Sequence, residues 1–143
     1  MVLSEDDAIE RLASKVIDRS LPKVEWTHAA HFATALWLLR NRPDLATPLE
    51  IREIITRYNE ATSTANTDSG GYHHTITLAS MRAAAEHLRA HSPDAPLHAV
   101  LLSLMASPLG HSDWLLSYWS RDALFSVAAP RAWVEPDRAP LPF

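Results

Sequence analysis

The chain of 143 residues is 47% hydrophobic and 21% charged, which is typical of one globular domain and argues against a disordered chain. Its 13 basic and 17 acidic residues give a net charge of −4, which argues against nucleic-acid binding. No cysteine is present, so disulfides and thiolate metal sites are excluded. An acidic start without an apolar signal core, and the lack of a long apolar run, predict a soluble, cytoplasmic protein with no membrane segment.

The apolar spacing is helical along most of the chain, and no segment shows the alternation of a strand. We therefore expect an all-α fold, a single-domain bundle of about five to six helices over residues 1–129. The prolines concentrated in residues 130–143 predict an extended C-terminal tail that packs on the same domain.

In chain order, Ser4 is expected to cap a first helix that ends near residue 17. Residues 25–40 are apolar on all sides, which is typical of a central, buried helix. Thr47 begins the next helix, because Pro48 follows it and Glu50 completes a capping box.

A long helix is expected over residues 72–90, a shorter one from about residue 96, and another over 112–119, before a short turn at 121–125. One sector of the long helix is predicted to face water, and it contains Thr75, Arg82, Glu86 and Arg89. His73 lies on the opposite side and should point inward, whereas His74 lies at the boundary between the two faces.

Eight histidines are the unusual part of the composition. His28 and His31 are three residues apart, so they share one helix face at the head of an apolar stripe. Buried imidazoles need polar partners, which a metal ion, a ligand, a carboxylate or backbone carbonyls could provide. His87 and His91 lie about 20 Å along the helix from His73 and cannot join the same site.

Residues 66–71 form a loop with two of the three glycines, which permit positive φ and close backbone approach. The loop ends where the long helix begins, and free N–H groups there would suit an anion or a carboxylate-bearing substrate. An ordinary turn capped by Asp68 or Ser69 is the alternative. The candidate substrate-binding residues are Asn66, Thr67, Asp68, Gly70 and Gly71.

Three phrases resemble those of a family of small bacterial proteins of unknown function. They begin at Trp26 (W-T-H-A-A-H), Asn66 (N-T-D-S-G-G-Y-H) and Trp133 (W-V-E-P-D). The resemblance covers most of the chain and implies a shared site, with no activity to carry over. It also implies a glutamate where this chain has His74, so that an imidazole replaces a hard carboxylate at a candidate ligand position.

The first functional hypothesis is a metal-binding protein or a metal-dependent enzyme. Its ligands would be His28, His31 and His73, with Glu25 or His74 completing the shell. Three imidazoles with an open position suit a divalent metal such as zinc or non-haem iron, which activates water or oxygen. Glu25 or Tyr72 would then be the catalytic residue for proton transfer.

The second hypothesis is a metal-free small-molecule binding module or enzyme, in which the same histidines act as acids, bases or donors beneath the 66–71 loop. The third is a non-catalytic helical interaction domain, because five tryptophans suit an interface and a homo-oligomer. The stretch from Trp114 to Trp119 is the candidate contact surface, with ordinary core as the alternative. An enzyme and a binding protein are both compatible with these residues.

Overall fold

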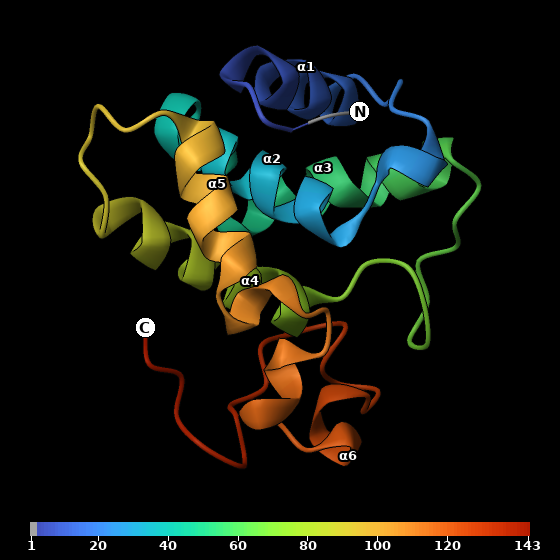
Figure 1. Ribbon diagram of the computed structural model, residues 1–143. Coiled ribbons are helices and arrows are strands. Elements are labelled where there is room, and N and C mark those ends of the chain that lie inside the picture. Colours follow the sequence, from blue (N-terminus) through green and yellow to red (C-terminus); the bar gives the residue numbers. More distant parts are fainter. Residues whose placement is uncertain (1–2) are drawn as a thin grey trace.

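The computed structural model describes residues 3–143 as helices with short connections, and it confirms the all-α, single-domain fold (Figure 1). With η denoting a 3-10 helix, the elements are α1 (Asp6–Ile17), η1 (Lys23–Glu25), α2 (His28–Asn41), η2 (Pro43–Leu45), α3 (Pro48–Ala61), α4 (His74–Arg89), α5 (Leu97–Ala106), η3 (Pro108–Gly110), η4 (Trp114–Ser117) and α6 (Arg121–Leu124). Within residues 3–143 there is no strand, and a single bridge pairs Thr67 with Gly70.

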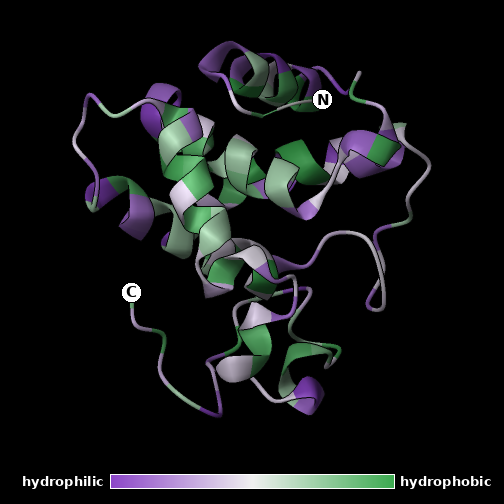
Figure 2. Cartoon of the chain, in the orientation of Figure 1, coloured by the Kyte–Doolittle hydropathy of each residue, from purple (hydrophilic) through white to green (hydrophobic). Residues whose placement is uncertain are grey.

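Helix α2 is the centre of the molecule and contacts α1, α4 and α5. Figure 1 shows α1 lying across the top and α5 running down beside α2, and Figure 2 shows hydrophobic colouring over much of α2 and α5. The buried side chains of α2 are Ala30, Phe32, Ala33, Thr34, Ala35, Leu36 and Leu38. The predicted central helix is therefore confirmed, although it begins only at His28, where the Thr27 hydroxyl accepts a hydrogen bond from the Ala30 amide.

Asp6, in the acidic first turn of α1, caps the helix α5. The N-cap residue of α1 is Glu5 and no side chain caps it, so the prediction for Ser4 is wrong. The Asp6 carboxylate instead accepts hydrogen bonds from the amides of Leu97 (3.2 Å) and His98 (2.9 Å). Asp6 thereby caps α5, which has no side-chain cap of its own.

Two further element predictions have opposite outcomes. The Thr47 cap is confirmed, because its hydroxyl accepts a hydrogen bond from the Glu50 amide at 3.4 Å. The helix expected over 112–119 is wrong, because only the short turn η4 forms there. Trp114 and its neighbour Leu115 are both buried in this turn.

The C-terminal segment returns to the beginning of α4. The amides of His74 and Thr75 donate to the carbonyls of Pro130 and Ala129, at 3.0 and 3.1 Å. The Thr75 hydroxyl donates to the Ala129 carbonyl as well, at 2.8 Å. Thr75 is fully buried, so the prediction that it faces water is wrong; helical periodicity cannot show that a distant segment covers this face.

The tryptophan-rich stretch belongs to the core. Trp114, Leu115 and Trp119 are 5%, 4% and 0% exposed. The Trp119 indole donates to the Val134 carbonyl at 2.9 Å, and its ring meets that of Trp133 edge-on. The ordinary-core interpretation of this stretch is the one that these contacts support.

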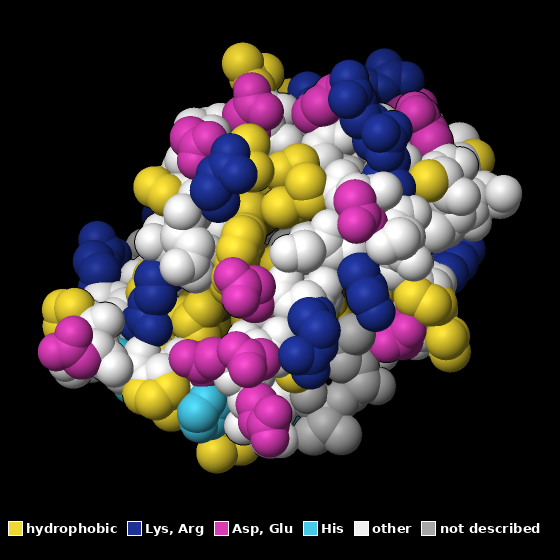
Figure 3. Space-filling view, turned by 90° about the horizontal axis from the view of Figure 1, so that it is seen from above, with side chains coloured by type: hydrophobic (Ala, Val, Ile, Leu, Met, Phe, Trp, Pro, Cys, Tyr) yellow, Lys and Arg dark blue, Asp and Glu magenta, His cyan; other side chains and the backbone are white. Residues whose placement is uncertain are grey.

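The face above α1 carries acidic and basic side chains interspersed around apolar ones, and neither charge sign dominates it (Figure 3). Of the helices between residues 3 and 143, none combines the length and the apolar character needed to span a bilayer.

Candidate functional site

Three adjoining cavities surround the beginning of α4, and we call them together the α4 cleft. A central cavity of about 330 Å³ lies between Trp26 and His31 on one side and Tyr72 and His73 on the other. An apolar recess of about 60 Å³ shares the Trp26 and His31 walls. A loop cavity of about 440 Å³ shares the Tyr72 and His73 walls and is bounded by residues 67–71.

His31 forms part of the walls of the central cavity and of the recess. Its Nδ1 lies 2.6 Å from the Thr27 carbonyl oxygen, and its ring stacks on Trp26 with the centroids 3.8 Å apart. Because a carbonyl only accepts, Nδ1 carries the proton and Nε2 keeps its lone pair. Within residues 3–143 the structure gives Nε2 no hydrogen bond, and the residue as a whole is exposed.

The electrostatics of His31 favour its neutral form. Desolvation by the surrounding protein atoms, and then the neighbouring His28, lower the pKa of His31 below its ordinary value. The ring is therefore uncharged at pH 7, and Nε2 is available as an acceptor or a base.

His28 turns away from His31 although the two share a helix face. Its Nε2 donates to the Leu109 carbonyl at 2.8 Å, and its ring meets Phe32 edge-on. His28 therefore links α2 to η3 and does not line the α4 cleft.

His73 is the N-cap of α4, and both of its ring nitrogens are engaged by the backbone. Its Nδ1 accepts from the Ile76 amide at 3.1 Å, and its Nε2 donates to the Leu124 carbonyl at 2.7 Å. Burial lowers the pKa of His73, which agrees with a neutral ring that donates at one nitrogen and accepts at the other. The expectation that Asp68 or Ser69 caps this helix is wrong, because the helix begins only after His73, whose own side chain is the cap.

The beginning of α4 does not present free N–H groups. The first four amides, those of residues 74–77, donate to backbone carbonyls or to the His73 ring. The expectation of free donors at this helix end is therefore wrong, since they are already paired, and the substrate-binding role of residues 66–71 stays a prediction.

Tyr72 lines both the central and the loop cavity and is 7% exposed. Its hydroxyl oxygen lies 2.6 Å from Nδ1 of His74, and the Arg52 guanidinium lies over its ring, 5.5 Å from the centre. Burial raises the pKa of Tyr72, while burial and then Arg52 lower the pKa of His74. The pair is thus a neutral phenol and a neutral imidazole at pH 7, with Tyr72 on the wall of the cleft and His74 behind it.

Two of the predicted loop residues shape the loop itself. The Asn66 side-chain oxygen accepts hydrogen bonds from the Tyr72 amide and from the Asn59 side chain, both at 2.9 Å. Gly71 has φ +79°, and a Cβ added there would lie 2.3 Å from the Ala65 carbonyl oxygen. The cavity-facing members of the predicted set are Thr67, Asp68, Gly70 and Gly71.

Asp68 connects the loop to the C-terminal segment. Arg131 donates to its carboxylate through two nitrogens, at 2.7 and 2.6 Å, and thereby holds the pKa of Asp68 below its ordinary value. The Arg52 guanidinium donates to the Arg131 carbonyl. Sequence reasoning missed both arginines, because neither lies near the loop in the chain.

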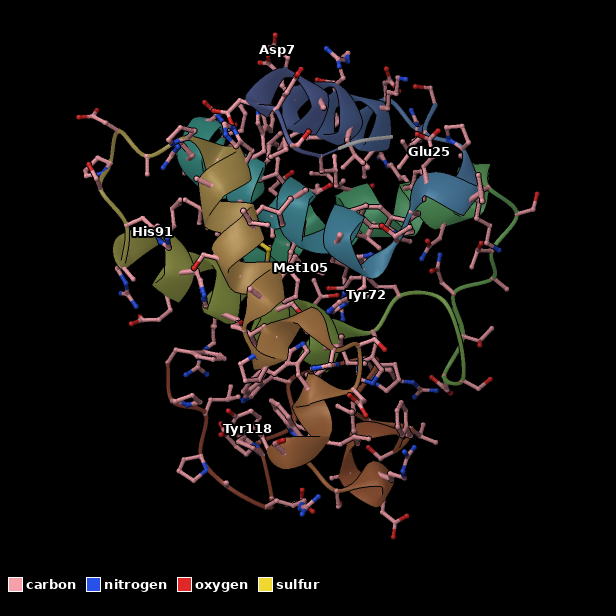
Figure 4. The ribbon with its side chains drawn as sticks, viewed as in Figure 1. Asp7, Glu25, Tyr72, His91, Met105 and Tyr118 are labelled. Carbon is pink, nitrogen blue, oxygen red and sulfur yellow. The ribbon has the colours of Figure 1, made fainter. Side chains whose placement is uncertain are left out.

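Glu25, the other predicted catalytic residue, ends η1 and does not line the α4 cleft. Figure 4 shows Glu25 at η1, above and apart from Tyr72. A polar residue that sequence reasoning missed lies nearer: Thr34 lines the recess, is 3% exposed, and its hydroxyl has no hydrogen-bond partner within residues 3–143. A threonine inside an otherwise apolar stretch of helix was the available signal.

The structure does not gather the predicted metal ligands. Among the described residues, no group of three or more histidine, aspartate or glutamate side chains is placed to hold a metal ion. Each of the three donates to a backbone carbonyl, and His73 uses its second nitrogen as well, to cap α4. The zinc or iron site stays a prediction, and these contacts do not favour it.

Comparisons with protein-family models, with curated proteins and with solved structures find no match. The family resemblance therefore remains an expectation drawn from its three phrases. The function is inferred from the geometry of the cleft.

Proposed function

We propose that this protein binds a small, partly apolar molecule in the α4 cleft and that Nε2 of His31 accepts a hydrogen bond or a proton from it. One observation carries the proposal: His31 lines the central cavity, and its bond to the Thr27 carbonyl holds the ring in the tautomer that leaves a lone pair on Nε2. A neutral imidazole held in this way is a ready acceptor and general base.

The walls of the cleft indicate the character of the ligand. Trp26, Ile55 and Ile76 supply apolar surface to the central cavity and to the recess. Lys23 lies on the exposed side of the same cavity and can pair with an anionic group. A flat apolar ring with a hydroxyl for His31 and a carboxylate for Lys23 fits this arrangement, and the cavity volume of about 330 Å³ lies within the range of about 300–1,000 Å³ common for ligand pockets.

The test is a calorimetric or NMR titration with 4-hydroxybenzoate, compared with benzoate, which lacks the hydroxyl donor. The wild-type protein should bind 4-hydroxybenzoate more tightly. His31→Phe keeps a ring that can stack on Trp26 and removes both nitrogens, so the preference should disappear, with a loss of about tenfold in affinity for one hydrogen bond.

His28→Phe is the matched control, because His28 lies on the same helix face but outside the cleft. It should leave the affinity for 4-hydroxybenzoate unchanged under conditions in which both variants are folded. Equal losses in the two variants, or no saturable binding of either compound by the wild-type protein, would overturn the proposal.

A further inference from the structure

A second cavity, separate from the α4 cleft, lies beneath the C-terminal segment. Its volume is about 440 Å³, within the range of about 300–1,000 Å³ common for small-molecule pockets. Its walls come from η3, η4, His87 of α4, and the end of the chain at Phe143. Figure 4 shows Tyr118, another wall residue, in the lower part of the molecule, away from Tyr72.

The wall residue Trp114 has a buried indole nitrogen without an acceptor. Trp114 is 5% exposed, and its Nε1 is shielded from solvent with no hydrogen-bond partner within residues 3–143. The indoles of Trp119 and Trp133 each donate, to the Val134 carbonyl and to the Glu135 carboxylate. An indole nitrogen can only donate, so Trp114 lacks a hydrogen-bond acceptor, which a carbonyl or a similar group would provide.

The other wall residues indicate the chemical character of the rest of a ligand that carries this carbonyl. Leu109 and Phe143 offer apolar surface, and the Phe143 ring centroid lies 6.1 Å from that of Trp114. Asp113 places a carboxylate on the exposed rim. Burial lowers the pKa of His87, so this wall residue is neutral at pH 7 and does not compete for the carboxylate as a cation.

We propose that this cavity is a second ligand site, which takes a ring-containing amine that also carries a carbonyl. The carbonyl accepts from Trp114, the ring packs against Leu109 and Phe143, and the ammonium pairs with Asp113. Because Nε1 of Trp114 is shielded from solvent, a covering group has to shift as the ligand enters.

The experiment is a ¹H–¹⁵N NMR titration of the indole signals of the five tryptophans with 4-(aminomethyl)benzamide. Trp114→Phe identifies the Trp114 signal by its loss. That signal should move downfield and saturate, because its proton gains an acceptor. Benzylamine, which lacks the carbonyl, and benzamide, which lacks the amine, should each bind about tenfold more weakly.

Asp113→Asn is the matched variant for the rim. It should weaken the binding of 4-(aminomethyl)benzamide and leave that of benzamide unchanged. His31→Phe should not alter the Trp114 response, which separates this site from the proposed function of the α4 cleft. An unmoved Trp114 signal, or an equal shift with all three compounds, would overturn the proposal.

Discussion

Single ring nitrogens decide what each histidine near the α4 cleft can do. His73 has none to spare, because one nitrogen caps α4 and the other holds the Leu124 carbonyl. His28 donates away from the cleft, toward Leu109. His31 donates from Nδ1 to the carbonyl of Thr27, the N-cap of α2. Its Nε2 keeps a lone pair, and the residue lines the central cavity. All three residues are histidines, and their hydrogen-bond partners decide their roles. His31 can act as a base, whereas His28 and His73 hold the structure together.

The lowered pKa of His31 predicts a stability that depends on pH. Below the ordinary histidine value of 6.5, the unfolded chain binds more protons than the folded protein, so the free energy of unfolding should fall as the pH falls from 7.5 to 5.5. His31 contributes at most about 1.4 kcal/mol per pH unit, because it exchanges one proton, and its partial exposure reduces this contribution. Urea unfolding across this pH range measures the slope.

His31→Phe should make that slope shallower without removing it, since the pKa values of His73, His74 and His87 are lowered as well. An unchanged slope in the variant would show that His31 keeps its ordinary pKa in the folded protein.

Gly71 and Gly70 allow a matched prediction for the loop. Gly71→Ala should lower the free energy of unfolding by about 1–3 kcal/mol, because φ is +79° and the new Cβ would meet the Ala65 carbonyl. Gly70→Ala should have little effect, since the nearest atom lies 3.9 Å from the position of its Cβ. Urea unfolding of both variants checks this, and similar losses at the two positions would contradict it.

Helix α4 is the element on which the cleft depends, because its first turn is held from outside. His73 caps it from the loop, and the carbonyls of Ala129 and Pro130 accept its next amides from the C-terminal segment. The helix therefore holds the loop, the cleft wall and the tail in one arrangement. A change in any of these contacts should therefore alter the geometry of the cleft.

Thr75→Val tests the link between α4 and the tail. The fully buried hydroxyl donates to the Ala129 carbonyl and accepts from the Val134 amide at 3.1 Å, so its removal should cost about 1–3 kcal/mol. Thermal or urea unfolding measures the loss. Ser80→Ala on the same helix is the control, and a comparable loss there would argue against a special role for Thr75.

At the scale of the whole molecule, segments far apart in the chain meet at the 66–71 loop. The Asp68–Arg131 pair ties the loop to the tail, and Arg52 of α3 donates to the carbonyl of the same arginine. This pair is exposed, so it contributes little to global stability and acts on the position of the loop.

Asp68→Asn should therefore raise the hydrogen exchange of residues 66–71 while leaving the melting temperature nearly unchanged. Hydrogen exchange read by mass spectrometry checks the loop. Asp44→Asn, which breaks the exposed pair of Asp44 with Arg42, should leave exchange in the loop as it was. Equal exchange of the loop in wild type and Asp68→Asn would show that Arg131 does not hold it.

Local sequence patterns were sufficient to predict the helical fold, the central helix expected over residues 25–40 and the cap at Thr47, because these follow from local periodicity and from contacts three or four residues apart. The sequence also directed attention to His31, Tyr72 and the glycine loop, which line the cleft.

Three features required the folded structure: the direction in which each histidine side chain turns, the burial of Thr75 under the C-terminal segment, and the capping of α5 by Asp6. The contacts of His28, Thr75 and Asp6 join residues that are tens of positions apart, whereas the bond of His31 to Thr27 spans four positions. The geometry of these contacts depends on how the helices pack, which the local spacing of residues does not predict.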